Sequence, residues 1–194
     1  MLKFKFPKIG IICIALLTVL GAAAFSPEEK PMKDNRVASL QAFDIILEVI
    51  KSPRCINCHP TDDVPRQGDD QHKHLFGVTR GKDDHGGPVQ KCNTCHQSKN
   101  VEYSNVPGAP KWALAPRSMG WIGLTDAQLG QALMDKSKNG GKSPAELVEH
   151  MGHDSLVLWA WNPGKGRTPP PVPVEEFRKV LQTWLETGAH VPTE

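Results

Sequence analysis

The sequence predicts a mainly α-helical, loop-rich single domain, on three observations. Several stretches place apolar side chains three and four residues apart, which is the spacing of one helical face, and no stretch shows the two-residue period of a strand. Capping residues, prolines and glycines stand where these helical patterns begin and end. Residues 61–90 are polar and glycine-rich, with few apolar side chains and no recognisable regular element.

Residues 1–24 have the layout of a secretory signal peptide. Three lysines precede an apolar run over residues 9–20, and small residues follow it at 21–24. We expect cleavage after Ala24. The alternative is an uncleaved anchor over residues 9–25, a run of 17 residues at the lower limit for crossing a membrane. In both cases the rest of the chain is exported, so we expect a periplasmic protein.

Residues 25–35 are rich in Pro, Glu and Lys without an apolar period, which predicts a tether before a domain over residues 36–194. The first helix is expected over residues 36–51 and to be ended by Pro53. Its apolar face consists of Val37, Leu40, Phe43, Ile46, Leu47 and Ile50.

Four further helical segments are expected downstream. A capping box at Thr125 and Gln128 opens a helix to about Asp135. Ser143, followed by Pro144 and Glu146, opens a second helix that Gly152 stops. A third segment is expected from a cap at Asp154 through Trp161. The last is expected over residues 174–187, with Gly188 as its C-cap. An extended, proline-rich connection over residues 164–173 separates these two segments. The first and last helices are expected to pack together.

The charge balance argues against a nucleic-acid partner. Without the three leader lysines the chain has 20 basic and 21 acidic residues, so it has no basic surplus and no polybasic membrane patch. Membrane association is expected only if the N-terminal segment is retained. Proteins or small redox carriers are the expected partners.

Two copies of one pentapeptide pattern hold every cysteine of the chain except Cys13 in the leader. Cys55, Cys58 and His59 form the first C-x-x-C-H motif, and Cys92, Cys95 and His96 form the second. This spacing is typical of covalent attachment of c-type haem, with the His as the proximal axial ligand of the iron. The alternatives are a zinc site and a pair of disulfides. The sequence therefore predicts two covalently bound haems c.

The two predicted haems are expected to share one core. Only 32 residues separate His59 from Cys92, too few for an independent domain around the first haem. Residues 61–90 have too few apolar side chains to offset their own ordering entropy. We therefore expect the porphyrins to supply the apolar surface that orders this segment.

The distal axial ligands are left open among the remaining His and Met side chains. Three are favoured as candidates: His74 in the polar stretch, Met119 in a loop with Trp on both sides, and His150 on a capped helix. Three candidates for two irons imply that one supports a ligand without binding iron, or that one iron is open. The choice matters because a Met ligand raises the haem potential relative to two His ligands.

Further segments resemble a dihaem cytochrome family whose members are often labelled as subunits of an isoquinoline 1-oxidoreductase. They are residues 53–55, 58–60, 67–70, 106–112, 114–116, 119–121, 139–141, 150–151, 157–164 and 188–189. The resemblance implies a periplasmic haem protein that takes electrons from a molybdenum hydroxylase and passes them to a downstream cytochrome or oxidase. The family tends to end in Gly-Ala-x-Cys-Pro, whereas this chain has His190 and Val191 before Pro192 and no Cys there.

Three functions are compatible with two haems. An electron-transfer protein, which is not itself an enzyme, needs no acid–base side chain and is the leading hypothesis. A peroxidase-like dihaem enzyme needs one open iron beside an acid–base group such as Glu102 or Glu149. A haem-based gas sensor also needs an open or weakly ligated iron. Function must be argued from the site and not from the fold.

Overall fold

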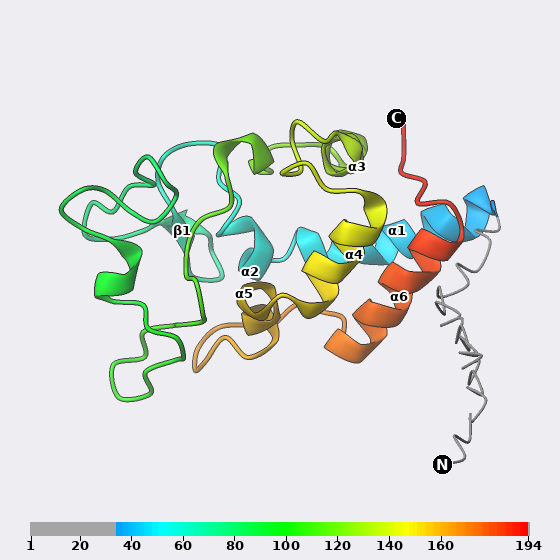
Figure 1. Cartoon of the computed structure of the whole chain (residues 1–194). Helices are drawn as coiled ribbons and strands as arrows, with labels where there is room; N and C mark the ends of the chain where they lie inside the picture. The colour runs from blue at the N-terminus through cyan, green and yellow to red at the C-terminus, as the bar shows by residue number, and fades with distance from the viewer. Residues whose placement is uncertain (1–33, 194) are drawn as a thin grey trace, which may run out of the picture. The chain divides into compact units, whose positions relative to one another are not determined.

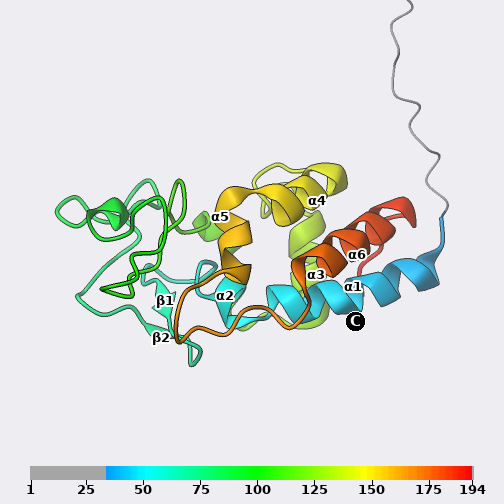
Figure 2. The ribbon, with the colours of Figure 1, turned by 90° about the horizontal axis from the view of Figure 1, so that it is seen from below.

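Helices α1 (Arg36–Ile50) and α6 (Val174–Glu186) pack side by side, as predicted (Figures 1 and 2). The structure is a computed structural model that describes residues 34–193. The rings of Phe43 and Trp184 meet at 5.8 Å between centroids. Each of these two side chains is fully buried. The predicted leader or anchor and most of the predicted tether lie outside the described residues. Within the described residues, no helix is long and apolar enough to cross a membrane.

Helix α1 confirms the predicted first helix with one correction at its start. The Asn35 side chain accepts a hydrogen bond from the Ala38 N–H and caps the helix. Val37 was expected on the buried face, but it is 67% exposed. The reason is geometric: each three-residue step falls about 60° short of a full helical turn, so the row from Phe43 back to Val37 drifts off the core-facing side.

Helices α3 (Asp126–Met134) and α4 (Pro144–His153) confirm the two predicted capping boxes. Gly152 does not stop α4, which continues to His153. Asp154 then caps α5 (Ser155–Leu158), as predicted, and the short 3₁₀ helix η3 (Trp159–Trp161) follows directly.

The predicted end of the first helix before Pro53 is confirmed, since α1 ends at Ile50. Pro53 also begins the short helix α2 (Pro53–Ile56), which was not expected. Pro is well suited to a first helical turn, where its missing N–H has no partner to lose. A small antiparallel pair, β1 (Arg66–Gln67) and β2 (His72–Lys73), lies in the stretch where no regular element was expected. Strands of two residues are too short to show a period in the sequence.

The described residues fall into two halves joined by α2 (Figures 1 and 2). We call helices α1, α3, α4, α5 and α6 the helical half, and residues 61–115 the loop half. The helical half holds the apolar core, whose fully buried side chains include Phe43, Ile46, Leu129, Leu147, Phe177, Leu181 and Trp184. The mainly helical class predicted from the sequence is confirmed.

Candidate functional site

The first C-x-x-C-H motif lies in α2 and the turn that follows it. The Cys58 N–H donates to the Cys55 carbonyl at 3.1 Å, and the His59 N–H donates to the Ile56 carbonyl at 3.0 Å. These bonds continue the helical turn past the end of α2. Because residues three and four apart lie on one helical face, Cys55, Cys58 and His59 line the same cavity.

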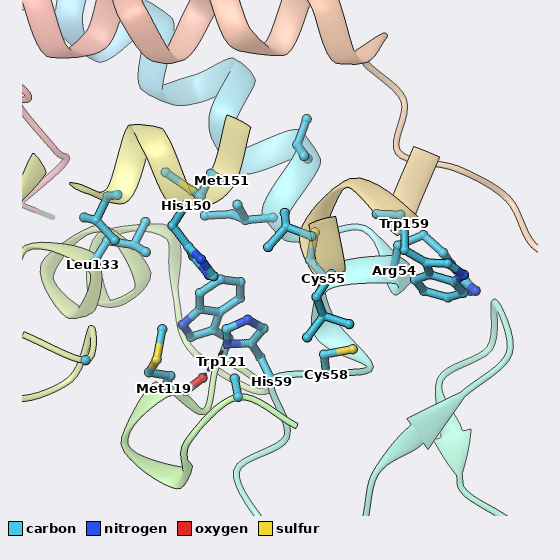
Figure 3. Close-up of a pocket in the computed structure, with 18 of the residues that line it drawn as sticks. Arg54, Cys55, Cys58, His59, Met119, Trp121, Leu133, His150, Met151 and Trp159 are labelled. Carbon is cyan, nitrogen blue, oxygen red and sulfur yellow. Dashed lines mark hydrogen bonds between the residues drawn. The ribbon is translucent and has the colours of Figure 1, made fainter. Parts of the chain in front are cut away.

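This cavity has a volume of about 380 Å³ (Figure 3). Its walls come from α1, α4, α5, η3, α6 and the loop over residues 113–121, and they are mostly apolar. Cavities of roughly 300–1,000 Å³ with apolar walls and a few polar groups are typical of cofactor sites. The volume and lining therefore fit a flat apolar macrocycle held by the two thiols.

Two contacts from the loop over residues 113–121 fix the His59 ring. Its Nδ1 lies 2.8 Å from the Met119 carbonyl oxygen, and its ring stacks on Trp121 at 3.4 Å between centroids and 9° between planes. A ring nitrogen facing a carbonyl must donate, so Nδ1 carries the proton and Nε2 presents its lone pair. Burial lowers the pKa of His59 to about 3. The imidazole is therefore neutral, as a metal ligand must be.

His96 in the second motif has the same surroundings, built from other residues. The motif forms the 3₁₀ helix η1 (Cys92–Thr94) and the turn after it. The His96 Nδ1 lies 2.7 Å from the Pro107 carbonyl oxygen, and its ring stacks on Trp112 at 4.5 Å and 9°. Burial lowers the pKa of His96 as well. Both motif histidines thus keep Nε2 free and one ring face covered by an indole.

The structure places His74 beside His96 and brings the other two candidates to the first cavity. The His74 and His96 rings are 6.1 Å apart and nearly perpendicular, and the His74 Nδ1 is bonded to the Leu75 carbonyl. Two imidazoles that ligate one ion at about 2 Å each have ring centres roughly 6 Å apart. His150 points into the first cavity from α4 (Figure 3).

Met119 also lines the first cavity, but its backbone carbonyl is the group that accepts the His59 Nδ1 proton. This bond places the Met119 backbone on the side of the imidazole opposite Nε2. Met151, which was in the wider set of candidates, shares the cavity wall. His72 and His190 are each paired with an aspartate.

The four described cysteines are free thiols. Burial raises the pKa of Cys55 to about 12 and that of Cys58 to about 11, and Cys92 is shifted in the same direction by the same cause. Within residues 34–193, no three His, Cys, Asp or Glu side chains converge to hold a metal ion. A haem iron needs only two axial side chains, whereas a structural zinc site needs about four ligands.

Arg54 supplies a polar feature that sequence reasoning missed. Its side chain is 2% exposed and lines the first cavity next to Cys55. One guanidinium nitrogen bonds the Gly68 carbonyl at 3.0 Å and Asp69 at 2.6 Å, while its Nε has no hydrogen-bond partner. A buried donor without a partner is costly. A haem propionate is an anion that this donor could bind, so Arg54 fits the predicted cofactor.

Arg80, also missed, ties the loop half to the first motif. It is almost fully buried, pairs with Asp84 at 2.7 Å, and donates to the carbonyls of Pro60 and Ala115. The Ala115 N–H in turn donates to the Cys58 carbonyl at 3.0 Å. These bonds hold part of the loop half against the first motif, and Cys92 of the second motif is close enough to Cys58 to raise the pKa of that thiol further.

No family model matches the chain, and no curated protein and no solved structure matches it either.

Proposed function

We propose that this chain is an exported dihaem c-type cytochrome that carries electrons between two redox proteins and is not itself an enzyme. The observation that carries the proposal is the repeated histidine environment. In each C-x-x-C-H motif, Nδ1 donates to a backbone carbonyl and the ring stacks at 9° on a tryptophan. Such fixed imidazoles with a free Nε2 are what axial ligation of iron requires.

Haem, when bound, supplies the one-electron chemistry, and the residues of the chain hold and orient it. Cys55 and Cys58 would attach the first haem and Cys92 and Cys95 the second, with His59 and His96 as proximal ligands. We assign His150 as the distal ligand of the first haem, because it points into the cavity that His59 lines. We assign His74 to the second, because its ring lies 6.1 Å from His96. Met119 supports His59 through its carbonyl.

The family resemblance and the charge balance support the proposed partners. A molybdenum hydroxylase would donate electrons, and a downstream cytochrome or oxidase in the periplasm would accept them. The two haems are proposed to share one interior, since Ala115 bonds to Cys58 and Arg80 bonds to Pro60 and Ala115.

Haem content tests the proposal directly. We expect the purified protein to give a pyridine haemochrome spectrum with two haems per chain. Cys58→Ala and Cys95→Ala should each lose one haem, because a c-type haem needs its thioether bonds for stable retention. Thr94→Ala, an exposed change inside the second motif, is the matched control and should retain both. Zinc in place of haem in metal analysis would refute the proposal.

Absorption spectra separate the electron carrier from a peroxidase-like enzyme or a gas sensor. We expect two six-coordinate, low-spin haems in the resting protein. His150→Ala and His74→Ala should each convert one haem to high spin, whereas His153→Ala and His72→Ala should convert neither. A resting high-spin haem that responds to peroxide or carbon monoxide would favour an open iron. High spin in Met119→Leu would restore Met119 as a ligand.

A further inference from the structure

Two tryptophans connect the surroundings of the two motifs. Trp112 stacks on His96 of the second motif, and Trp159 in η3 lines the cavity of the first (Figure 3). Their rings meet edge to face, with 4.8 Å between centroids and 83° between planes. An unbroken series of aromatic contacts therefore runs from His96 to the wall of the first cavity.

Asn100 holds this pair in place from the loop half. Its side-chain oxygen accepts the Trp159 indole N–H at 2.9 Å and the Gly108 backbone N–H at 3.0 Å, while its amide donates to the Asn162 carbonyl at 2.8 Å. Gly108 is needed there because a Cβ would lie 2.4 Å from the carbonyl oxygens of Gln97 and Lys99. One amide thus fixes Trp159 against the loop that holds His96.

We infer, on the basis of the proposed function, that Trp112 and Trp159 form the electronic bridge between the two haem sites. The electron leaves one iron and arrives at the other, so one haem is oxidised and the other reduced, while the indoles end unchanged and no proton moves. Electronic coupling decays more slowly through aromatic rings in contact than across an equal gap. Packing alone would explain half-buried tryptophans, but it does not require a continuous series that ends on a motif histidine.

Internal electron transfer in the holoprotein tests this bridge. A laser flash with a flavin reductant would reduce the faster-reacting haem, and absorption would then follow the concentration-independent redistribution to the other. Trp159→Leu should slow this phase several-fold, and Trp159→Phe should slow it less because a ring remains. Trp159 is the cleaner target, since Trp112 touches an axial histidine.

Tyr103→Leu is the matched control. Tyr103 is an aromatic side chain of the loop half that is 95% exposed and belongs neither to the wall of the first cavity nor to the series of ring contacts. This variant should transfer electrons at the parent rate. Haem content, both midpoint potentials and the electron paramagnetic resonance g-values should be unchanged in the control and in Trp159→Phe. Asn100→Ala should slow transfer while both indoles remain.

The outcomes separate the bridge from the proposed function. An unchanged rate in Trp159→Leu and Trp159→Phe, with two haems present, would overturn the bridge and leave the dihaem cytochrome intact. Equal slowing in Tyr103→Leu would also overturn it. A parent protein without haem would refute the proposed function itself. If Trp159→Leu loses a haem, the rate in Trp159→Phe decides.

Discussion

The helical half and the loop half support the same kind of histidine site by different physical means. In the helical half, Phe43, Leu181 and Trp184 are fully buried in one apolar core. In the loop half, the buried side chains are Arg80 and the smaller Pro65 and Ala109, and the large apolar side chains Leu75, Phe76, Val89 and Tyr103 are exposed. The comparison shows that a stacked, carbonyl-bound imidazole occurs both beside a large apolar core and in a segment without one.

Several cross-links of the loop half join residues that are far apart in the chain. Arg80 bonds carbonyls at Pro60 and Ala115, and Asp69 accepts from Arg54 and from the backbone and hydroxyl of Thr168. A buried arginine is strongly destabilising if it loses its partners, so these bonds specify one arrangement. The loop half should therefore depend on charge and the helical half on apolar volume.

Trp184→Ala should give the largest loss of stability. Removing a fully buried indole leaves a cavity and should lower the free energy of unfolding by about 3–5 kcal/mol. Urea unfolding followed by far-ultraviolet circular dichroism measures this loss. Val37→Ala, on the exposed side of α1, is the control and should change it by less than about 0.5 kcal/mol. Similar effects of the two changes would contradict an apolar core between α1 and α6.

Arg80→Met should loosen the loop half and spare the helical half. Its bonds to Asp84, Pro60 and Ala115 would be lost, with a local cost of about 3 kcal/mol. Hydrogen exchange measured by mass spectrometry should speed up over residues 61–91 and stay slow in α1 and α6. Lys82→Met, an exposed lysine in the same segment, should leave the exchange unchanged. Uniformly faster exchange would contradict the division into two halves.

Features that depend on residues close together in the chain could be predicted from the sequence, whereas features that depend on distant residues could not. Caps such as Thr125 with Gln128 and Ser143 with Glu146 lie within four residues, so the starts of α3 and α4 were predicted correctly. The roles of Arg54 and Arg80 were missed because, apart from Asp84, their partners lie 14 to 35 residues away and are mostly backbone carbonyls that leave no local pattern.

The candidate sites show the same limit. The thiols and motif histidines were predicted because one pentapeptide contains them. The stacking of Trp121 on His59 and of Trp112 on His96 joins residues 62 and 16 positions apart, a spacing with no common signal. Met119 was singled out for its thioether, yet the contact it makes with His59 is through its carbonyl. Its role as an iron ligand stays a prediction.

The two proposed haems should differ in midpoint potential although both are assigned two histidines. His59 lies in the apolar first cavity, whereas Cys95 of the second motif is exposed. A less polar environment disfavours the extra charge of ferric iron, so the first haem should have the higher potential. A redox titration of the parent protein and of Cys95→Ala, which retains the first haem, assigns the two values. A higher potential for the second haem would contradict the comparison.

Mild acid should loosen the loop half before the helical half. The Arg66 guanidinium holds the pKa of Asp62 below its ordinary value, and the Thr168 hydroxyl does the same for Asp69. A carboxylate with a lowered pKa stabilises the fold above its ordinary pKa of about 4, and that stabilisation is lost as the pH falls through the lowered value. Each side chain is exposed by more than two fifths, so each loss should be under about 1 kcal/mol.

Amide resonances followed by nuclear magnetic resonance during an acid titration distinguish the two halves. Signals from residues 61–91 should change below about pH 4, before those of α1 and α6. The helical half also has two carboxyls with lowered pKa values, Asp135 and Glu146. Both accept hydrogen bonds at helix ends, so their protonation should fray α3 and α4 without opening the core. The double variant Asp62→Asn, Asp69→Asn should show the loosened loop signals already at neutral pH. If α1 and α6 lose their native signals first, the helical half depends on charge more than the loop half does.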